Sequence, residues 1–275
     1  VDRQTGYNSN VSLRFDVPNA NDPEGNYAGA IFRTDGAGRN LTEFDALTFY
    51  IKASQGVTIA ELGFGEDFEQ NKFMATITNV SVGTNWSKVI IPIPDASKLL
   101  QERGMFRYAA GTQGTNGMGY TFWIDDLKFE KLGTIRTIGA SIMNGSNAFI
   151  NTFVGVNSSV SGIISTFNLP NGRNQIVNLS PSYFEFFSSS PTVASVNSSG
   201  MVNSLSAGTS IITATINGIQ ATGSLTINCS GVFVHAPIPT RNRANVISIF
   251  SDAYNNVPVN YYNGYWQPWQ TTVSN

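Results

Sequence analysis

The most regular alternation of apolar and polar positions in the chain lies between Tyr120 and Lys131. Its residues divide between two sides, with Trp123, Asp125, Leu127 and Phe129 on one and Phe122, Ile124 and Asp126 on the other. This period of two predicts a strand with two unlike faces. Adjacent carboxylates are unusual there, because Asp is depleted from strands and costly to bury without a partner. A bound cation would compensate their charge, so Asp125 and Asp126 are candidate metal ligands.

Other alternating or apolar runs end at Pro, Gly, Asn or Asp, and they predict further strands over Val11–Val17, Tyr27–Phe32, Leu47–Lys52, Ile59–Phe64, Lys72–Ile77 and Trp86–Ile93. One short helix is predicted over Ser97–Arg103, with Asp95 or Ser97 as its cap and Gly104 at its end. The glycine-rich stretch Gly111–Gly119 is predicted to be a loop. Many strands with almost no helix indicate an all-β fold, with a jelly-roll β-sandwich over residues 1–133.

After residue 133 the composition shifts to Ser, Asn, Thr, Val and Ile. Alternating runs restart on either side of Asn217-Gly218, and Asn-Gly between two such runs is a strong hairpin signal. We therefore expect a second all-β unit over residues 134–230. The Pro-containing stretch 231–243 is predicted to be a semi-rigid linker. A new β pattern then begins, and residues 244–275 are expected to be a partial third module.

The composition limits the classes of function. Charged residues make up only 12% of the chain and the formal net charge is −2, which gives no electrostatic basis for binding nucleic acid or an anionic membrane. No apolar run reaches the about 18 residues of a transmembrane helix, so no transmembrane segment is expected. Val1 lies within a pattern and is not an initiating Met, so we expect a processed or partial segment of a longer protein.

Three stretches of sequence carry resemblances to known families. Trp86-Ser-Lys-Val-Ile-Ile-Pro-Ile-Pro-Asp95, followed by the strand from Tyr120 to Phe129, resembles the galactose-binding-like jelly rolls used as carbohydrate-binding modules. That resemblance implies sugar binding and a structural Ca2+ held by Asp125 or Asp126. The motifs SSPTVASVNSSGMV, LSAGTSIITATI and GSLTI strongly resemble the group-2 bacterial immunoglobulin-like domain, which mostly serves as a spacer. The motif VISIFSDAYNNVP, with Trp266 and Trp269, looks like the start of a second, laminarinase-associated jelly-roll module.

Sugar binding requires flat apolar rings for the CH-rich faces of the sugar and polar groups for its hydroxyls. In the first unit the aromatic candidates are Phe64, Phe68, Tyr108, Tyr120 and Trp123, with Glu66, Asp67, Arg33 and Arg107 as polar partners. Phe68, Tyr108 and Tyr120 are expected in or beside loops. Trp123 could serve in the core or as a platform, and Trp86 is expected in the core. A second aromatic platform, or an interface anchor, could be formed by Tyr262, Tyr265, Trp266 and Trp269.

Catalytic interpretations are less favoured. Glu61, Glu66, Asp67 and Glu69 could supply the paired carboxylates of a glycosidase, but their spacing differs from the Glu-x-Asp-x-x-Glu arrangement of the β-glucanases. The single cysteine, Cys229, excludes an intrachain disulfide. A catalytic pair of Cys229 with His235 is conceivable, but we favour the interpretation of His235 as an exposed linker residue. We therefore expect no enzyme within this chain, although the parent protein could be a glycoside hydrolase.

The favoured hypothesis is non-catalytic binding of a polysaccharide or oligosaccharide, with β-glucan preferred because of the laminarinase resemblance. The resemblances imply a multi-module protein for polysaccharide utilisation of Bacteroidota type, either a lipoprotein on the extracellular face of the outer membrane or secreted. One alternative is the accessory arm of a laminarinase-like glycoside hydrolase whose catalytic domain lies outside this chain. A second alternative is a structural subunit docked on an outer-membrane uptake or secretion complex.

Overall fold

The computed structural model describes residues 1–68, 71–234, 259–262 and 265–268. The chain divides into two compact units, Val1–Phe233 and Val234–Asn275. In the described residues the regular structure is β-strand joined by loops and short 3-10 turns, which confirms the prediction of an all-β fold. No helix in this part of the chain combines the length and apolar character needed to span a membrane.

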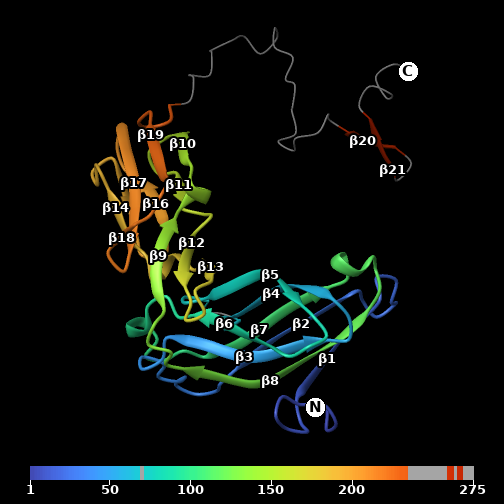
Figure 1. The fold of residues 1–275 in the computed structure, drawn as a ribbon. Coiled ribbons are helices and arrows are strands. Elements are labelled where there is room, and N and C mark those ends of the chain that lie inside the picture. Colours follow the sequence, from blue (N-terminus) through green and yellow to red (C-terminus); the bar gives the residue numbers. More distant parts are fainter. Residues whose placement is uncertain (69–70, 235–258, 263–264, 269–275) are drawn as a thin grey trace. The chain divides into compact units, whose positions relative to one another are not determined.

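The first eight strands form a two-layered sandwich, drawn in blue to green in Figure 1. One layer has the order β1-β8-β3-β6 and the other contains β2-β7-β4-β5. The strand bounds are Leu13–Val17 (β1), Tyr27–Arg33 (β2), Ala46–Ala53 (β3), Val57–Phe64 (β4), Ala75–Val82 (β5), Ser87–Pro92 (β6), Gly104–Gly111 (β7) and Tyr120–Glu130 (β8). Alternate side chains from both layers fill the core, and Phe49, Phe64, Phe106 and Phe122 are fully buried there.

Strand β8 departs from strict alternation at Asp126. Its φ is 51°, and two residues of β8 stand opposite one residue of β3, because the register shifts between Thr48 and Tyr50. This β-bulge turns the following residues over. Leu127 and Phe129 therefore pack against the core, on the side of Phe122 and Ile124, and the prediction that they share a face with Trp123 is wrong.

Three other predictions need correction. The helix expected over Ser97–Arg103 is only a 3-10 turn, Ala96–Lys98, which Asp95 caps as expected by accepting from the Ser97 amide at 3.1 Å. The chain then leaves the helical path because Glu102 pairs with Arg39. The strand expected to begin at Lys72 begins at Ala75. Strand β7, which directly follows Arg103, was not predicted.

A second β-region follows the first sandwich within the same compact unit. Its strands are Arg136–Ser141 (β9), Asn147–Thr152 (β10), Asn157–Ser159 (β11), Ile164–Asn168 (β12), Asn174–Leu179 (β13), Glu185–Ser188 (β14), Ala194–Val196 (β15), Met201–Ser204 (β16), Gly208–Ile216 (β17), Ile219–Gln220 (β18) and Ser224–Cys229 (β19). The sheets are β10-β19-β17-β14, with β18 on β17, and β11-β16-β15. The hairpin turn predicted at Asn217-Gly218 is confirmed, with φ values of 49° and 76°. Cys229 is buried and free.

One layer of the first sandwich continues into the second β-region. Its full order is β2-β7-β4-β5-β13-β12-β9, and the link is the antiparallel pairing of β13 with β5 (Figure 1). Leu179 stands opposite Ala75 and Asn178 opposite Thr76. The two regions therefore share backbone hydrogen bonds as well as packed side chains.

In the second compact unit, Val259–Tyr262 (β20) and Tyr265–Pro268 (β21) form an antiparallel hairpin. Of the predicted second platform, Tyr262, Tyr265 and Trp266 lie in these strands, whose side chains are not described. Trp269, Glu69, His235 and residues 236–243 of the predicted linker lie outside the described residues.

We expect the first sandwich and the second β-region to unfold together, because they share a sheet. Phe122→Ala in the first and Phe167→Ala in the second each empty a fully buried site, at a cost of about 3–5 kcal/mol. In scanning calorimetry both variants should lower the temperature of the same transition. Two separate transitions, each moved by only one variant, would contradict the shared sheet.

Candidate sugar-binding groove

A groove with a volume of about 460 Å³ lies over strands β2 and β7. It is lined by Tyr27, Gly29, Ala30, Ile31, Glu66, Phe68, Arg107, Tyr108 and Ala109. Four residues predicted as sugar ligands, Glu66, Phe68, Arg107 and Tyr108, therefore line one cavity although they are distant in sequence. The cavity size is within the range of small-molecule sites in proteins.

Two exposed aromatic rings stand at this groove. Tyr27 is 53% exposed and Phe68 is 68% exposed, so each presents apolar ring surface to solvent. Gly29 makes room for the Tyr27 ring, because a Cβ at Gly29 would lie only 3.0 Å from Tyr27 Cε1. Gly29 pairs with Ala109 across the two strands, which gives the groove a shallow floor of small residues. Flat rings beside a smooth floor suit the CH-rich face of a pyranose.

The polar centre of the groove is Arg107. Its guanidinium contacts the carboxylates of both Glu61 and Glu66, and all three side chains are at most 27% exposed. Burial raises the pKa of Glu66 and lowers the pKa of Arg107, because both charged forms lose water. One cation between two anions leaves no excess positive charge in the groove. The guanidinium and the two carboxylates instead offer several hydrogen-bonding atoms to sugar hydroxyls.

Two glycines bring the loop that carries Glu66 and Phe68 against strand β7. Gly65 has φ of 84° and donates its amide hydrogen to the Gly104 carbonyl at 2.8 Å. A Cβ at Gly65 would lie 2.2 Å from the Phe73 carbonyl oxygen, and one at Gly104 would lie 2.4 Å from the Glu66 nitrogen. Neither position accepts a side chain without displacing backbone, so the close approach depends on both glycines.

Asp67 fixes the same loop through buried ion pairs. It is only 5% exposed, and its carboxylate lies 3.1 Å from Arg33 Nη1 and 3.2 Å from Arg103 Nε. Its amide hydrogen is donated to Asn71 Oδ1 at 3.0 Å. Arg33 and Asp67 were predicted to contact sugar, but here they bind each other and do not line the groove. Their contact with sugar stays a prediction.

Two predicted platforms are not in loops. Tyr108 lies within β7 and lines the groove, but it is only 8% exposed. Tyr120 begins β8, is 6% exposed, and donates its hydroxyl to the Gly111 carbonyl at 3.2 Å. Burial raises the pKa of both phenols. Phe64 is fully buried. The expectation of a position in or beside a loop is therefore wrong for Tyr108, whereas Tyr120 does lie beside a loop, at the start of β8.

Trp123 lies on the other layer, away from the groove. Its Nε1 donates to Asp2 Oδ2 at 2.8 Å, and Lys52 Nζ lies 5.1 Å from its ring centre and 5.3 Å from that of Trp86. Tyr7 packs edge-on against Trp86 at 6.2 Å. Trp86 is half-buried on this outer face, so its expected place in the core is wrong. The N-terminal segment thus occupies part of this aromatic surface.

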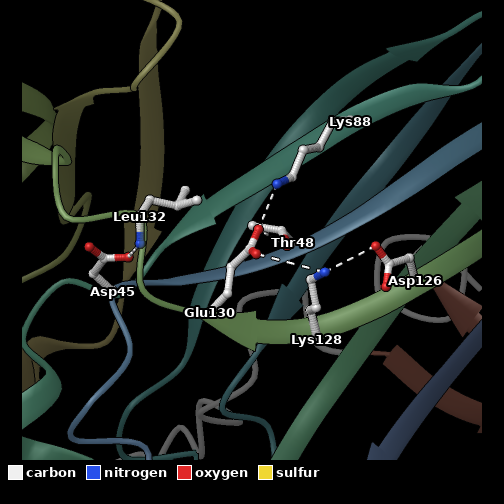
Figure 2. A network of polar contacts seen from close by, with 7 residues as sticks. All are labelled: Asp45, Thr48, Lys88, Asp126, Lys128, Glu130 and Leu132. Carbon is white, nitrogen blue, oxygen red and sulfur yellow. Dashed lines mark hydrogen bonds and ion pairs between the residues drawn. The ribbon is translucent and has the colours of Figure 1, made fainter.

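The two strand carboxylates already have partners on that same layer. Lys128 Nζ lies 3.1 Å from Asp126 Oδ2. Figure 2 shows this ion pair beside the contact of Lys88 with Glu130. Asp125 Oδ2 accepts hydrogen bonds from the Tyr7 amide at 2.7 Å and the Ser9 hydroxyl at 3.1 Å.

Asp125 thus has two neutral hydrogen-bond donors and Asp126 has a lysine, so the contacts favour two separately bonded carboxylates over a shared calcium ion. In the part of the chain that the structure describes, no cluster of three His, Cys, Asp or Glu side chains could hold a metal. The calcium predicted at Asp125 or Asp126 therefore remains to be tested, and these donor contacts favour two carboxylates without a metal.

Sequence reasoning missed Tyr27 and the small residues of the floor. The signal was present in β2, where Tyr27, Gly29 and Ile31 alternate with Ala28, Ala30 and Phe32. Without knowledge of β7 this pattern does not predict a groove, because only the pairing of Gly29 with Ala109 shows that the small residues form one surface. Glu61 was noted only as part of an acidic cluster, and its contact with Arg107 depends on the same missing strand.

The comparisons with known proteins agree with a sugar-binding class. The family model described as Carbohydrate binding domain 30 matches residues 1–131. This match supports non-catalytic carbohydrate binding by the first sandwich and agrees with the predicted carbohydrate-binding module. It ends before the residues that resemble an immunoglobulin-like domain and a laminarinase-associated module, so those two resemblances stay predictions.

Solved structures with similarity to the chain include family 30 carbohydrate-binding modules. A family 30 carbohydrate-binding module is 19% identical, over 47% of this chain and 72% of that chain, with a TM-score of 0.36. The family 30 module of the cellulosomal cellulase Cel9D-Cel44B of Clostridium thermocellum is 20% identical, over 48% and 82%, with a TM-score of 0.35. A β-1,2-glucanase from Parabacteroides distasonis is 10% identical, over 83% and 34%, with a TM-score of 0.31. No curated protein matches the chain in sequence.

The contacts of Asp125 and Asp126 make the calcium question testable. We expect that EGTA leaves the melting temperature of the protein unchanged, because backbone, hydroxyl and lysine donors already surround both carboxylates. Differential scanning fluorimetry with Ca2+ and with EGTA measures this. A rise in melting temperature with Ca2+ that Asp125→Asn removes would show that these residues do bind calcium.

Proposed function

We propose that this chain binds a neutral polysaccharide of β-glucan type in the groove over β2 and β7, without cleaving it. The observation that carries the proposal is the pair of exposed rings, Tyr27 and Phe68, beside a floor of small residues and the Arg107 cluster. The family match over residues 1–131 supports the same class of function. The rings would stack on the sugar, and the charged side chains would exchange hydrogen bonds with its hydroxyls.

The charges of the groove favour a neutral glycan. Arg107 is the lining cation, and it contacts two carboxylates, Glu61 and Glu66. A uronate or sulfate group would meet more negative than positive charge there, and it would have to displace one of those carboxylates from Arg107. Hydroxyl groups carry no such cost, because each can donate to a carboxylate or accept from the guanidinium.

The same contacts argue against hydrolysis. A glycosidase needs one carboxyl group that donates a proton and another that attacks or activates water. Here a single guanidinium contacts both carboxylates, so each is engaged in an ion pair and neither stands apart as a proton donor or as a base for water. The arrangement suits recognition of hydroxyls, and the family match supports a non-catalytic module.

The wider setting stays part of the proposal. An extracellular place, with lipid anchorage or secretion, is consistent with a polysaccharide ligand too large to enter the cell. The two alternatives differ in the protein to which this chain belongs: a glycoside hydrolase for the accessory arm, or an uptake or secretion complex for the structural subunit. Only the second alternative, a purely structural subunit, requires that the groove bind no sugar.

Removing either exposed ring should weaken binding to a soluble mixed-linkage β-glucan. We expect Tyr27→Ala and Phe68→Ala each to lower the affinity about tenfold, the effect of losing a central aromatic contact. Affinity electrophoresis measures the retardation. Phe149→Ala is the matched control, because Phe149 is 58% exposed but lies on β10 in the second β-region. Equal retardation of wild type, both groove variants and the control would contradict the proposed site.

The raised pKa of Glu66 predicts a dependence of binding on pH. Because burial raises this pKa above the ordinary 4.5, the carboxyl gains a proton at a higher pH than an exposed glutamate would. Protonation removes the charge that Arg107 contacts, so affinity should fall as the pH is lowered through that raised value.

Calorimetric titration with the same glucan between about pH 4 and pH 7 measures this decline, a range that starts near the ordinary glutamate pKa and extends above it. In Glu66→Gln the decline should disappear from the upper part of that range, because the amide does not titrate there. An unchanged pH profile in Glu66→Gln would exclude Glu66 as its source.

A further inference from the structure

The binding loop between β4 and β5 is held by the second β-region as well as by the first sandwich. We propose that Ser180 and Tyr183 are positioning residues for the groove, so that the second β-region is a working part of the binding unit. This inference rests on the proposed function, because it concerns the same groove. It assigns a part in binding to a region whose sequence resemblance indicates only a spacer.

The contact begins with the paired strands. Leu179, at the end of β13, stands opposite Ala75, the first residue of β5. Immediately beyond that pair, the Ser180 amide donates to the Met74 carbonyl at 2.9 Å. The second β-region therefore follows the backbone from β5 into the loop that carries Glu66 and Phe68.

The Ser180 side chain bonds twice to this loop. Its Oγ accepts from the Met74 amide at 3.1 Å and donates to the Asn71 carbonyl at 2.9 Å. Ser180 is 8% exposed, so water is largely excluded from these bonds. Without the hydroxyl, the Met74 amide and the Asn71 carbonyl would both lack this partner, which is costly at a shielded position.

From Asn71 the chain of contacts reaches the groove. Asn71 Oδ1 accepts from the Asp67 amide at 3.0 Å, and the Asp67 carboxylate is held by Arg33 and Arg103. Residues 66 and 68, on either side of Asp67, are the lining residues that the loop supplies. A displacement at Ser180 is therefore transmitted to Glu66 and Phe68 through two hydrogen bonds.

Tyr183 supports the loop at a second point. Its hydroxyl donates to the Phe73 carbonyl at 2.8 Å, and its ring lies 5.4 Å from the Phe73 ring. Tyr183 is 1% exposed, so the ring is locked in place. Lys98 joins the segment that carries Tyr183 to the first sandwich, because its Nζ donates to the carbonyls of Ser182 and Tyr183 at 2.9 and 3.0 Å.

The loop is thus fixed at its two ends by different parts of the chain. The start is fixed by Gly65 bonding to Gly104 within the first sandwich, and the end by Ser180 and Tyr183 from the second β-region. A pure spacer would need contact only with the end of β8 and would not bond to the backbone of a binding loop. Preorganising a loop in its binding conformation raises affinity, because less ordering remains to be done on binding.

Ser180→Ala and Tyr183→Phe in the full chain test the inference, each removing one hydroxyl and retaining the packing. Ser165→Ala is the matched control, since Ser165 is fully buried in the second β-region and donates to Gly139 at 2.9 Å, away from the loop. We expect affinity for soluble mixed-linkage β-glucan to fall about 3- to 10-fold in the two test variants, the loss that one hydrogen bond implies. The control should bind like wild type.

Two further measurements separate positioning from general destabilisation. Hydrogen exchange of the unliganded protein should be faster across residues 71–76 in Ser180→Ala and Tyr183→Phe, and unchanged there in Ser165→Ala. In a double-mutant cycle, the losses of affinity from Ser180→Ala and Phe68→Ala should be less than additive, because both act through one loop. Additive losses, or wild-type affinity in both test variants, would overturn the inference.

The outcomes distinguish this inference from the proposed function. If Tyr27→Ala and Phe68→Ala weaken binding but Ser180→Ala and Tyr183→Phe do not, the groove binds sugar and the second β-region does not position it. If the wild-type protein binds no glucan, both the proposed function and the positioning of a sugar site fail together.

Discussion

The geometry of the groove depends on a carboxylate that lies outside it. Asp67 is buried between Arg33 and Arg103, and burying that charge without both partners would be strongly unfavourable. The two arginines come from the end of β2 and from the residue before β7, the strands that form the floor. The ion pairs therefore fix the loop relative to the floor, and the neighbours Glu66 and Phe68 take their places at the groove as a consequence.

The chain has two aromatic surfaces, and the structure gives them different surroundings. Tyr27 and Phe68 are open to solvent beside a floor of small residues. Trp86 and Trp123, on the opposite layer, flank Lys52, and the N-terminal segment reaches them through Asp2 and Tyr7. The N-terminal segment thus covers part of the tryptophan surface, whereas both rings of the groove are open to solvent.

The sequence predicted the all-β fold, the long strand β8 and the Asn217-Gly218 hairpin, because alternation and turn residues are local signals. It also selected Phe68, Glu66 and Arg107, which share the groove. It missed β7, since Gly104 resembled a helix end and the glycines after Ala110 a loop. Without β7, the sequence does not show which strand lies beside Tyr27. The bulge at Asp126 was equally unpredictable, because it depends on the register with β3, a contact far apart in sequence.

The most direct test of this account is a map of the ligand contact on the labelled protein by amide chemical shifts. Titration with a soluble mixed-linkage β-glucan oligosaccharide should shift the amides of Gly29, Glu66 and Ala109, which lie in the groove. Shifts confined to Lys52, Trp86 and Trp123 would place the sugar on the opposite layer and contradict the account.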